Sequence, residues 1–414
     1  MYNLTKCALC GNEAELELSH TVPKMAVRTL KKTAIGNIRS TENPNKTIQD
    51  SEKLYMLCGD CEDLFSEKET WFANKIFHPY LKKEKTIFDY DENLAYFITS
   101  VNWRSLYLDI LDFVENSVVG IDALECLIES EKIMNEFLRG KRNDLGKIEN
   151  HIFFFDDIKE LSVGASNFGD LKPHATFHRG IGSYTFCYED EKTYGTLTNM
   201  MGVILVTLYH KGQREVWNNT EILNGVGRIE AKDQQIQSVF GNELIHIMET
   251  AKKASEAMSV AQQKKAEDRI KAAGEDVKNY SVFQDWMPFC RRPIRLMFLQ
   301  KSEYLTTALF HNTMLRTTTK QSYQDSCSCR CRKNSFVGHT LKQKVEKPRE
   351  STVASMHYRV LSIVANAEIF SEEWHGRPGV HHTTNGDVPA ELKRVQRKAV
   401  MQMPSVKQRF RMQW

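Results

Sequence analysis

Two short stretches decide how the N-terminal part of the chain folds: residues 7–20 read CALCGNEAELELSH, and residues 58–62 read CGDCE. Each stretch contains one C-x2-C pair. The four cysteines are Cys7, Cys10, Cys58 and Cys61. Two intervening residues let both thiolates of a pair bind one tetrahedral ion, and two pairs complete a four-sulfur shell for Zn²⁺. We therefore predict one structural zinc ion held by these four side chains.

The cysteine pairs have two other interpretations, as two redox-active dithiols or as four unrelated buried thiols. A thioredoxin-like dithiol needs a strand–helix–strand context, which the flanking sequence lacks. The 414-residue chain has 10 cysteines, too few for a disulfide-dense secreted scaffold. Because four thiolates leave no open coordination position, the predicted zinc would stabilise the fold and take no part in chemistry.

Between the two pairs, the sequence predicts a strand that ends at a histidine. Acidic and polar residues alternate with leucines over residues 15–19, and His20 follows them. Residues 36–51 (GNIRSTENPNKTIQDS) are polar and predict a loop. A helix over residues 62–69 should begin with Glu62, directly after the second pair. The histidine and this glutamate therefore lie on different predicted elements that the zinc would hold together.

This order of residues resembles the HNH endonuclease family in its zinc-supported ββα-metal form. The shared features are a C-x2-C pair, a strand ending in H-x-x-P, a variable loop, and a second C-x2-C pair followed at once by a metal ligand. The resemblance covers residues 7 to about 80, under a fifth of the chain. It implies that His20 is the general base that deprotonates the attacking water. It also implies that Glu62 binds the catalytic ion, Mg²⁺ or Mn²⁺.

Two positions depart from the family pattern. Ser19 stands where the family commonly has Asp or Glu, so the catalytic ion would bind Glu62, Glu17 or water. The asparagine that orients the base would be Asn43 or Asn45, and spacing does not choose between them. A second hypothesis therefore stays open, in which the zinc module binds nucleic acid or protein without cutting.

The implied roles suit phosphodiester hydrolysis. A neutral imidazole, with an ordinary pKa of about 6.5, accepts a proton near neutral pH. One divalent ion relieves the charge on the phosphate and the departing oxygen, and a carboxylate such as Glu62 is a suitable hard ligand for it. The alternative for His20 is a structural histidine packed in the core.

The rest of the chain predicts an α+β protein. Apolar residues recur every three to four positions over residues 92–116 and 121–138, which predicts two helices with buried faces. Residues 240–273 predict one long polar helix. Segments rich in β-branched and aromatic residues predict an antiparallel sheet, and they are residues 151–157, 183–190 and 201–212.

We divide the chain into four segments. They are an HNH-like zinc module (1–80), a helical segment (81–150), an α+β domain (151–316) and a basic, partly disordered C-terminal region (317–414). Residues 301–414 hold 19 Lys and Arg against 9 Asp and Glu. Such an excess favours binding to phosphate backbones through counterion release, although basic tails are also common as solvated segments.

Composition limits the classes of function. With 41% apolar and 26% charged residues, the chain reads as a globular protein. Its longest nearly apolar run, residues 200–209, is too short for the roughly 20 residues of a membrane span, and residues 1–10 lack a secretory pattern, which predicts a cytoplasmic protein. We predict a metal-dependent DNA endonuclease, by analogy with modular restriction and phage-defence proteins. RNA is the alternative substrate. The segment 151–316 would serve targeting, sensing or homo-oligomerisation.

Overall fold

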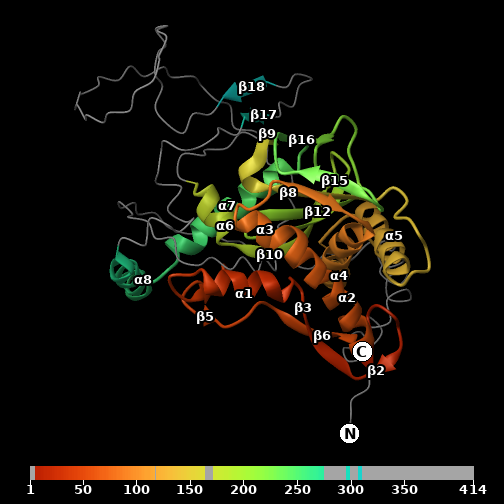
Figure 1. The fold of residues 1–414 in the computed structure, drawn as a ribbon, viewed down its shortest axis with the longest axis horizontal. Coiled ribbons are helices and arrows are strands. Elements are labelled where there is room, and N and C mark those ends of the chain that lie inside the picture. Colours follow the sequence, from red (N-terminus) through yellow and green to blue (C-terminus); the bar gives the residue numbers. More distant parts are fainter. Residues whose placement is uncertain (1–4, 117, 164–170, 275–294, 299–305, 310–414) are drawn as a thin grey trace, which may run out of the picture.

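The fold combines helices with antiparallel sheets, which confirms the predicted α+β class (Figure 1). A computed structural model describes residues 5–116, 118–163, 171–274, 295–298 and 306–309. The predicted basic C-terminal region, residues 317–414, lies outside these ranges. No helix within them combines the length and the apolarity that crossing a lipid bilayer requires.

The N-terminal elements form a strand ribbon followed by a helix, in the lower part of Figure 1. Strand β3 pairs antiparallel with β6, and α2 begins where β6 ends, so the predicted strand and helix are confirmed. The polar stretch 36–51 contains a small hairpin of β4 and β5. The bounds are β1 (Thr5–Lys6), β2 (Glu13–Ala14), β3 (Leu16–His20), α1 (Lys24–Lys32), β4 (Ile38–Arg39), β5 (Thr47–Ile48), β6 (Lys53–Cys58) and α2 (Gly59–Phe72).

Two long helices follow, and they begin and end at the predicted residues. Helix α4 is buried around most of its circumference because α2, α5 and the central sheet all pack against it. A short π-helical turn, η1, continues α2 into α3. The bounds are η1 (Ala73–Phe77), α3 (His78–Leu81), β7 (Ile87–Tyr90), α4 (Glu92–Asn116) and α5 (Ile121–Leu138).

The central sheet has five antiparallel strands in the order β10-β11-β12-β8-β14. Side chains alternate between its faces: Ile152 and Phe154 pack in the core cluster that includes α4, whereas Phe153 packs with Leu244 of helix α7 (Gly241–Glu256). Burial on both faces explains why β12 is apolar along nearly its whole length. The bounds are β8 (Glu149–Phe154), β10 (Ile181–Tyr188), β11 (Thr193–Met200), β12 (Val203–His210) and β14 (Glu221–Ile222).

A second sheet, in the order β13-β16-β9-β17-β18, is mixed, because β9 runs parallel to both β16 and β17. Strand β15 pairs separately with β7. The bounds are η2 (Phe155–Asp157), β9 (Ile158–Val163), α6 (Pro173–His178), β13 (Val216–Asn218), β15 (Gly227–Glu230), β16 (Gln234–Gln237), α7 (Gly241–Glu256), α8 (Val260–Ala273), β17 (Arg295–Phe298) and β18 (Thr306–Leu309).

The predicted single helix over residues 240–273 is wrong, because the chain breaks between α7 and α8. Ser259 has an extended backbone, with φ −66° and ψ 148°. The Asn45 side chain donates to Ala257 O at 3.1 Å and accepts from Ser259 N at 2.7 Å. A side chain distant in sequence thus satisfies backbone groups that the break leaves unpaired within the helices.

A buried polar network fixes α4 on the central sheet. Asn102 Nδ2 donates to Thr207 Oγ1 at 2.8 Å, and Asn102 Oδ1 accepts from Thr198 Oγ1 at 2.7 Å. Thr207 in turn donates to Asn150 Oδ1 at 2.8 Å. All four residues are buried, so water cannot replace the hydrogen bonds that are lost when one of the four is substituted.

We predict that Asn102→Ala lowers the free energy of unfolding by about 2 to 4 kcal/mol, because two buried threonine hydroxyls each lose one hydrogen-bond partner. Urea denaturation of the purified protein measures this change. Asn116→Ala is the matched control, since Asn116 is exposed at the end of the same helix, and we expect a change below about 0.5 kcal/mol. Equal effects of the two substitutions would contradict the network's role.

Candidate metal and catalytic site

The four predicted zinc ligands lie together. The sulfurs of Cys7, Cys10, Cys58 and Cys61 all lie within 4.8 Å of one another. The distance from Cys10 Sγ to Cys58 Sγ is 3.8 Å. Zn–S bonds of about 2.3 Å in a tetrahedron separate neighbouring sulfurs by about 3.8 Å. The cluster therefore has the dimensions of a structural metal site with four thiolate ligands.

Local backbone geometry brings the sulfurs together. Gly11 closes the first loop in the left-handed region at φ 77°, which costs a glycine little. Its N–H donates to Cys7 O at 2.9 Å. In the second pair, Cys58 ends β6, Cys61 lies in the first turn of α2, and Cys58 N donates to Cys7 Sγ at 3.4 Å.

Charge explains why this cluster suits a cation. A hydrogen bond with the Cys61 thiol lowers the pKa of Cys7 to about 4, and the same contact raises the pKa of Cys61. Burial raises the pKa of Cys58. One thiolate in the cluster thus opposes ionisation of its neighbours, whereas a bound divalent cation stabilises several thiolates at once. Four sulfur donors favour Zn²⁺ over Mg²⁺ or Ca²⁺.

Oxygen atoms that could bind a divalent cation lie together where the end of β3 approaches the start of α2. Ser19 Oγ donates to Glu62 Oε2 at 2.8 Å, and Ser19 is 2% exposed. The Glu17 carboxylate lies beside Gly59, because a Cβ at Gly59 would be 3.1 Å from Glu17 Oε1. The amino end of a helix favours carboxylates, and carboxylate and hydroxyl oxygens suit Mg²⁺ or Mn²⁺.

His20 is the last residue of β3, and its side chain is hydrogen-bonded to an aspartate that the sequence did not predict. Its side chain is mostly buried, and Nε2 lies 3.3 Å from Asp50 Oδ1. Asp50 Oδ2 pairs with Lys53 Nζ at 2.5 Å. Burial is the main cause that lowers the pKa of His20, Asp50 opposes this shift, and Lys53 adds to it. The net shift favours the neutral imidazole near pH 7.

The predicted base, His20, is the last residue of β3, and the predicted metal ligand, Glu62, contacts the residue before it. The two side chains share no hydrogen bond or ion pair. Ser19 contacts Glu62, and consecutive strand residues point to opposite faces. The predicted orienting residues lie elsewhere: Asn45 binds the α7–α8 break, and Asn43 is exposed in a turn. The hydrogen-bond partner of the imidazole is instead Asp50.

Arg104 contacts both the end of β3 and α2. The sequence did not predict this residue either. It lies in α4 and is 1% exposed. Its Nη1 donates to His20 O at 2.8 Å, and its Nη2 pairs with Glu69 Oε1 at 2.7 Å. The guanidinium also lies 5.3 Å from the ring centroid of Phe65. An arginine on the buried face of an apolar helix is a signal that could have identified this residue, whereas Asp50 in a polar stretch offers none.

Comparison of the chain with protein-family models, with curated proteins and with solved structures gives no match. The resemblance to HNH endonucleases therefore depends on the motif and on the contacts described above. Those contacts belong to residues 7–80, apart from Arg104.

We predict that the purified protein contains one zinc ion per chain and that Cys58→Ser loses it, because three thiolates and a hydroxyl bind zinc weakly. Elemental analysis by mass spectrometry measures the zinc content. Cys126→Ser is the control, since Cys126 is a half-buried free thiol in α5 outside the cluster, and we expect it to retain zinc. Full zinc content in the Cys58 variant would show that these sulfurs do not hold the ion.

Proposed function

We propose that the chain is an endonuclease that hydrolyses DNA phosphodiester bonds with a divalent ion and a histidine base. The observation that carries this proposal is the 2.8 Å contact between the side chains of Glu62 and Ser19, the residue that directly precedes His20 in β3. It brings two oxygen ligands together at the strand end that also carries the proposed base. The same order of base, zinc pairs and helix residue underlies the resemblance to the zinc-supported HNH family.

The side chains of this site divide into a base and metal ligands. Neutral His20 would accept a proton from the attacking water, and burial keeps it neutral. Glu62, Ser19 and Glu17 would hold Mg²⁺ or Mn²⁺ through oxygen. When bound, that ion neutralises charge on the scissile phosphate and the departing oxygen.

Asp50 would orient the base. If Nε2–H donates to Asp50, then Nδ1 carries the lone pair that accepts the proton. Lys53 neutralises Asp50 in turn, so the carboxylate orients the ring without strongly stabilising the imidazolium. Asp50 would therefore be a positioning residue, in the place that an asparagine holds in the family.

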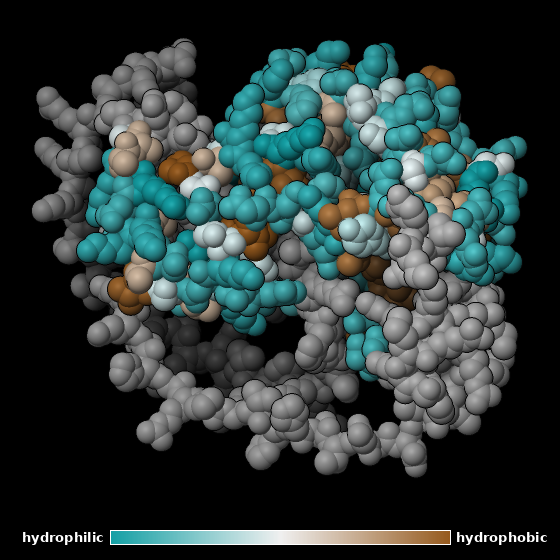
Figure 2. Space-filling model, turned by 90° about the horizontal axis from the view of Figure 1, so that it is seen from below, coloured by the Kyte–Doolittle hydropathy of each residue, from teal (hydrophilic) through white to brown (hydrophobic). Residues whose placement is uncertain are grey.

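A non-catalytic module that binds nucleic acid or protein is the second candidate. Leu18 and Tyr55 are cross-strand partners on the β3–β6 ribbon and are 47% and 71% exposed. Exposed aromatic and aliphatic side chains beside a site often contact a partner. Figure 2, which views the molecule from below, shows a mostly hydrophilic surface with small apolar areas among the described residues that are visible on that side.

We predict that the purified protein nicks plasmid DNA with Mg²⁺ or Mn²⁺. His20→Ala and Glu62→Gln should each lower the rate by at least about 100-fold, because one removes the base and the other a metal ligand. Agarose gels measure nicking. Glu67→Gln, an exposed carboxylate in the same helix, should nick at the wild-type rate.

Zinc content should stay unchanged in all three variants, which separates chemistry from folding. Wild-type protein that binds DNA but never nicks it with any divalent ion would favour the binding module. Nicking that persists in the His20→Ala variant would show that His20 is not the base.

We predict that Asp50→Asn lowers kcat by about 10-fold or more and moves the acid limb of the kcat/KM profile to lower pH. The base works when neutral, and Asp50 raises the pKa of His20, so its removal lowers that pKa further. Lys53→Met provides a control of opposite sign, because Lys53 lowers the pKa of His20, and its acid limb should move to higher pH. Shifts of the same sign in both variants would contradict the assignment.

A further inference from the structure

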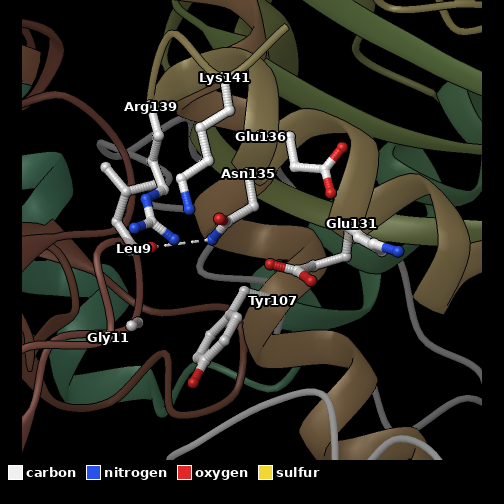
Figure 3. Close-up of a pocket in the computed structure, with 10 residues that line it drawn as sticks. Leu9, Gly11, Tyr107, Glu131, Asn135, Glu136, Arg139 and Lys141 are labelled. Carbon is white, nitrogen blue, oxygen red and sulfur yellow. Dashed lines mark hydrogen bonds between the residues drawn. The ribbon is translucent and has the colours of Figure 1, made fainter.

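A pocket of about 270 Å³ lies between the first cysteine loop and helices α4 and α5 (Figure 3). Leu9 and Gly11 line it from the loop, Tyr107 from α4, and Glu131 from α5. Its volume is near the lower end of the about 300 to 1,000 Å³ typical of small-molecule sites. The pocket therefore suits a ligand no larger than one nucleotide.

Two cations that follow α5 line this pocket. Helix α5 ends at Leu138, Gly140 follows it with φ 66°, and Arg139 and Lys141 flank this glycine. Figure 3 shows both side chains extending toward the loop that contains Leu9. Within the described residues neither side chain has an ion-pair partner, whereas the neighbouring Arg142 pairs with Asp144 at 2.9 Å. Lys132 and Glu136 also line the pocket. Two adjacent cations without an ion-pair partner favour a bound anion such as phosphate.

The inner end of the pocket is polar and aromatic. Glu131 is 6% exposed, and its Oε1 accepts from Trp103 Nε1 at 2.8 Å. Burial raises the pKa of Glu131 to about 7. Asn135 Nδ2 donates to Leu9 O at 3.1 Å, and Tyr107 lines the pocket from α4, with its hydroxyl directed away from Glu131 in Figure 3. A buried carboxyl next to an aromatic ring suits a planar ring that carries N–H donors.

We propose that this pocket binds one nucleotide unit, with its phosphate at Arg139 and Lys141 and its base near Tyr107 and Glu131. The unit is either a free nucleoside monophosphate or the 5′-phosphorylated end of a strand, since both present the same chemistry. The site is separate from His20 and Glu62, and the proposal does not depend on cleavage. The competing explanation is that the two cations only stabilise the carboxyl end of α5.

Isothermal titration calorimetry of the full chain with four nucleoside monophosphates, a 5′-phosphorylated trinucleotide and inorganic phosphate tests the proposal. Wild-type protein should bind at least one nucleotide ligand more tightly than phosphate. The double variant Arg139→Ala/Lys141→Ala should weaken that binding by about 10-fold or more, the equivalent of losing one charge-assisted hydrogen bond. Arg142→Ala, which removes a paired cation outside the pocket, should leave it unchanged.

A second variant separates the base subsite from the phosphate subsite. Glu131→Gln should weaken nucleotide binding and leave phosphate binding unchanged. Tighter binding of the trinucleotide would identify a strand end as the ligand, and tighter binding of a monophosphate would identify a free nucleotide. Nucleotide binding that the double variant retains, phosphate binding alone, or no binding at all would overturn the proposal. If the wild type binds none of the ligands and the double variant has a lower melting temperature, the two cations only stabilise the carboxyl end of α5.

Discussion

The convergence of four sulfurs within 4.8 Å is the constraint on which the N-terminal part of this protein depends. It joins a loop near the amino end of the chain to the junction of β6 and α2, 48 residues later. With that junction fixed, β3 pairs with β6, with a register shift between Glu17 and Leu18, and Ser19 meets Glu62 across 43 residues of sequence. A unit of this size buries little apolar surface by itself, so a metal bound by these sulfurs would contribute directly to its stability.

The cysteine cluster is also part of a larger core. It packs in one buried cluster with Phe65 of α2 and with Trp103 and Leu106 of α4. Helix α4 is bound to the sheet through Asn102 and to the strand end through Arg104. A buried ion pair such as that of Arg104 and Glu69 adds little net stability but is costly to break, and so it restricts how α2 and β3 can sit. The candidate site is thus positioned by sulfurs on one side and by α4 on the other.

Features that depend on local sequence were predictable. The spacing of the cysteines predicted their clustering, and apolar periodicity predicted α4 and α5 with their bounds, because burial on one or more faces repeats with the helical period. The alternation before His20 predicted β3, although Leu18 is exposed and Ser19 buried. For the site, sequence predicted the histidine, the glutamate and the metal ligands as candidates. Their roles stay predictions.

Features that depend on distant partners were not predictable. Nothing in residues 36–51 distinguishes Asp50 from other polar loop residues, since its role follows from the fold that places it beside His20. The break at Ala257 interrupts a continuous helical pattern, and it is stabilised by Asn45, more than 200 residues earlier. Such contacts leave no periodic trace in the sequence.

The proposed function requires the strand end at Ser19 and the first turn of α2 to form a divalent-ion site close to His20. Anomalous diffraction from crystals of the protein soaked in Mn²⁺ tests it most directly. We expect a manganese peak in contact with the Glu62 carboxylate, near the end of β3 that carries His20, and a separate zinc peak among the four sulfurs. A zinc peak alone, with Glu62 still bound to Ser19 in saturating Mn²⁺, would contradict it.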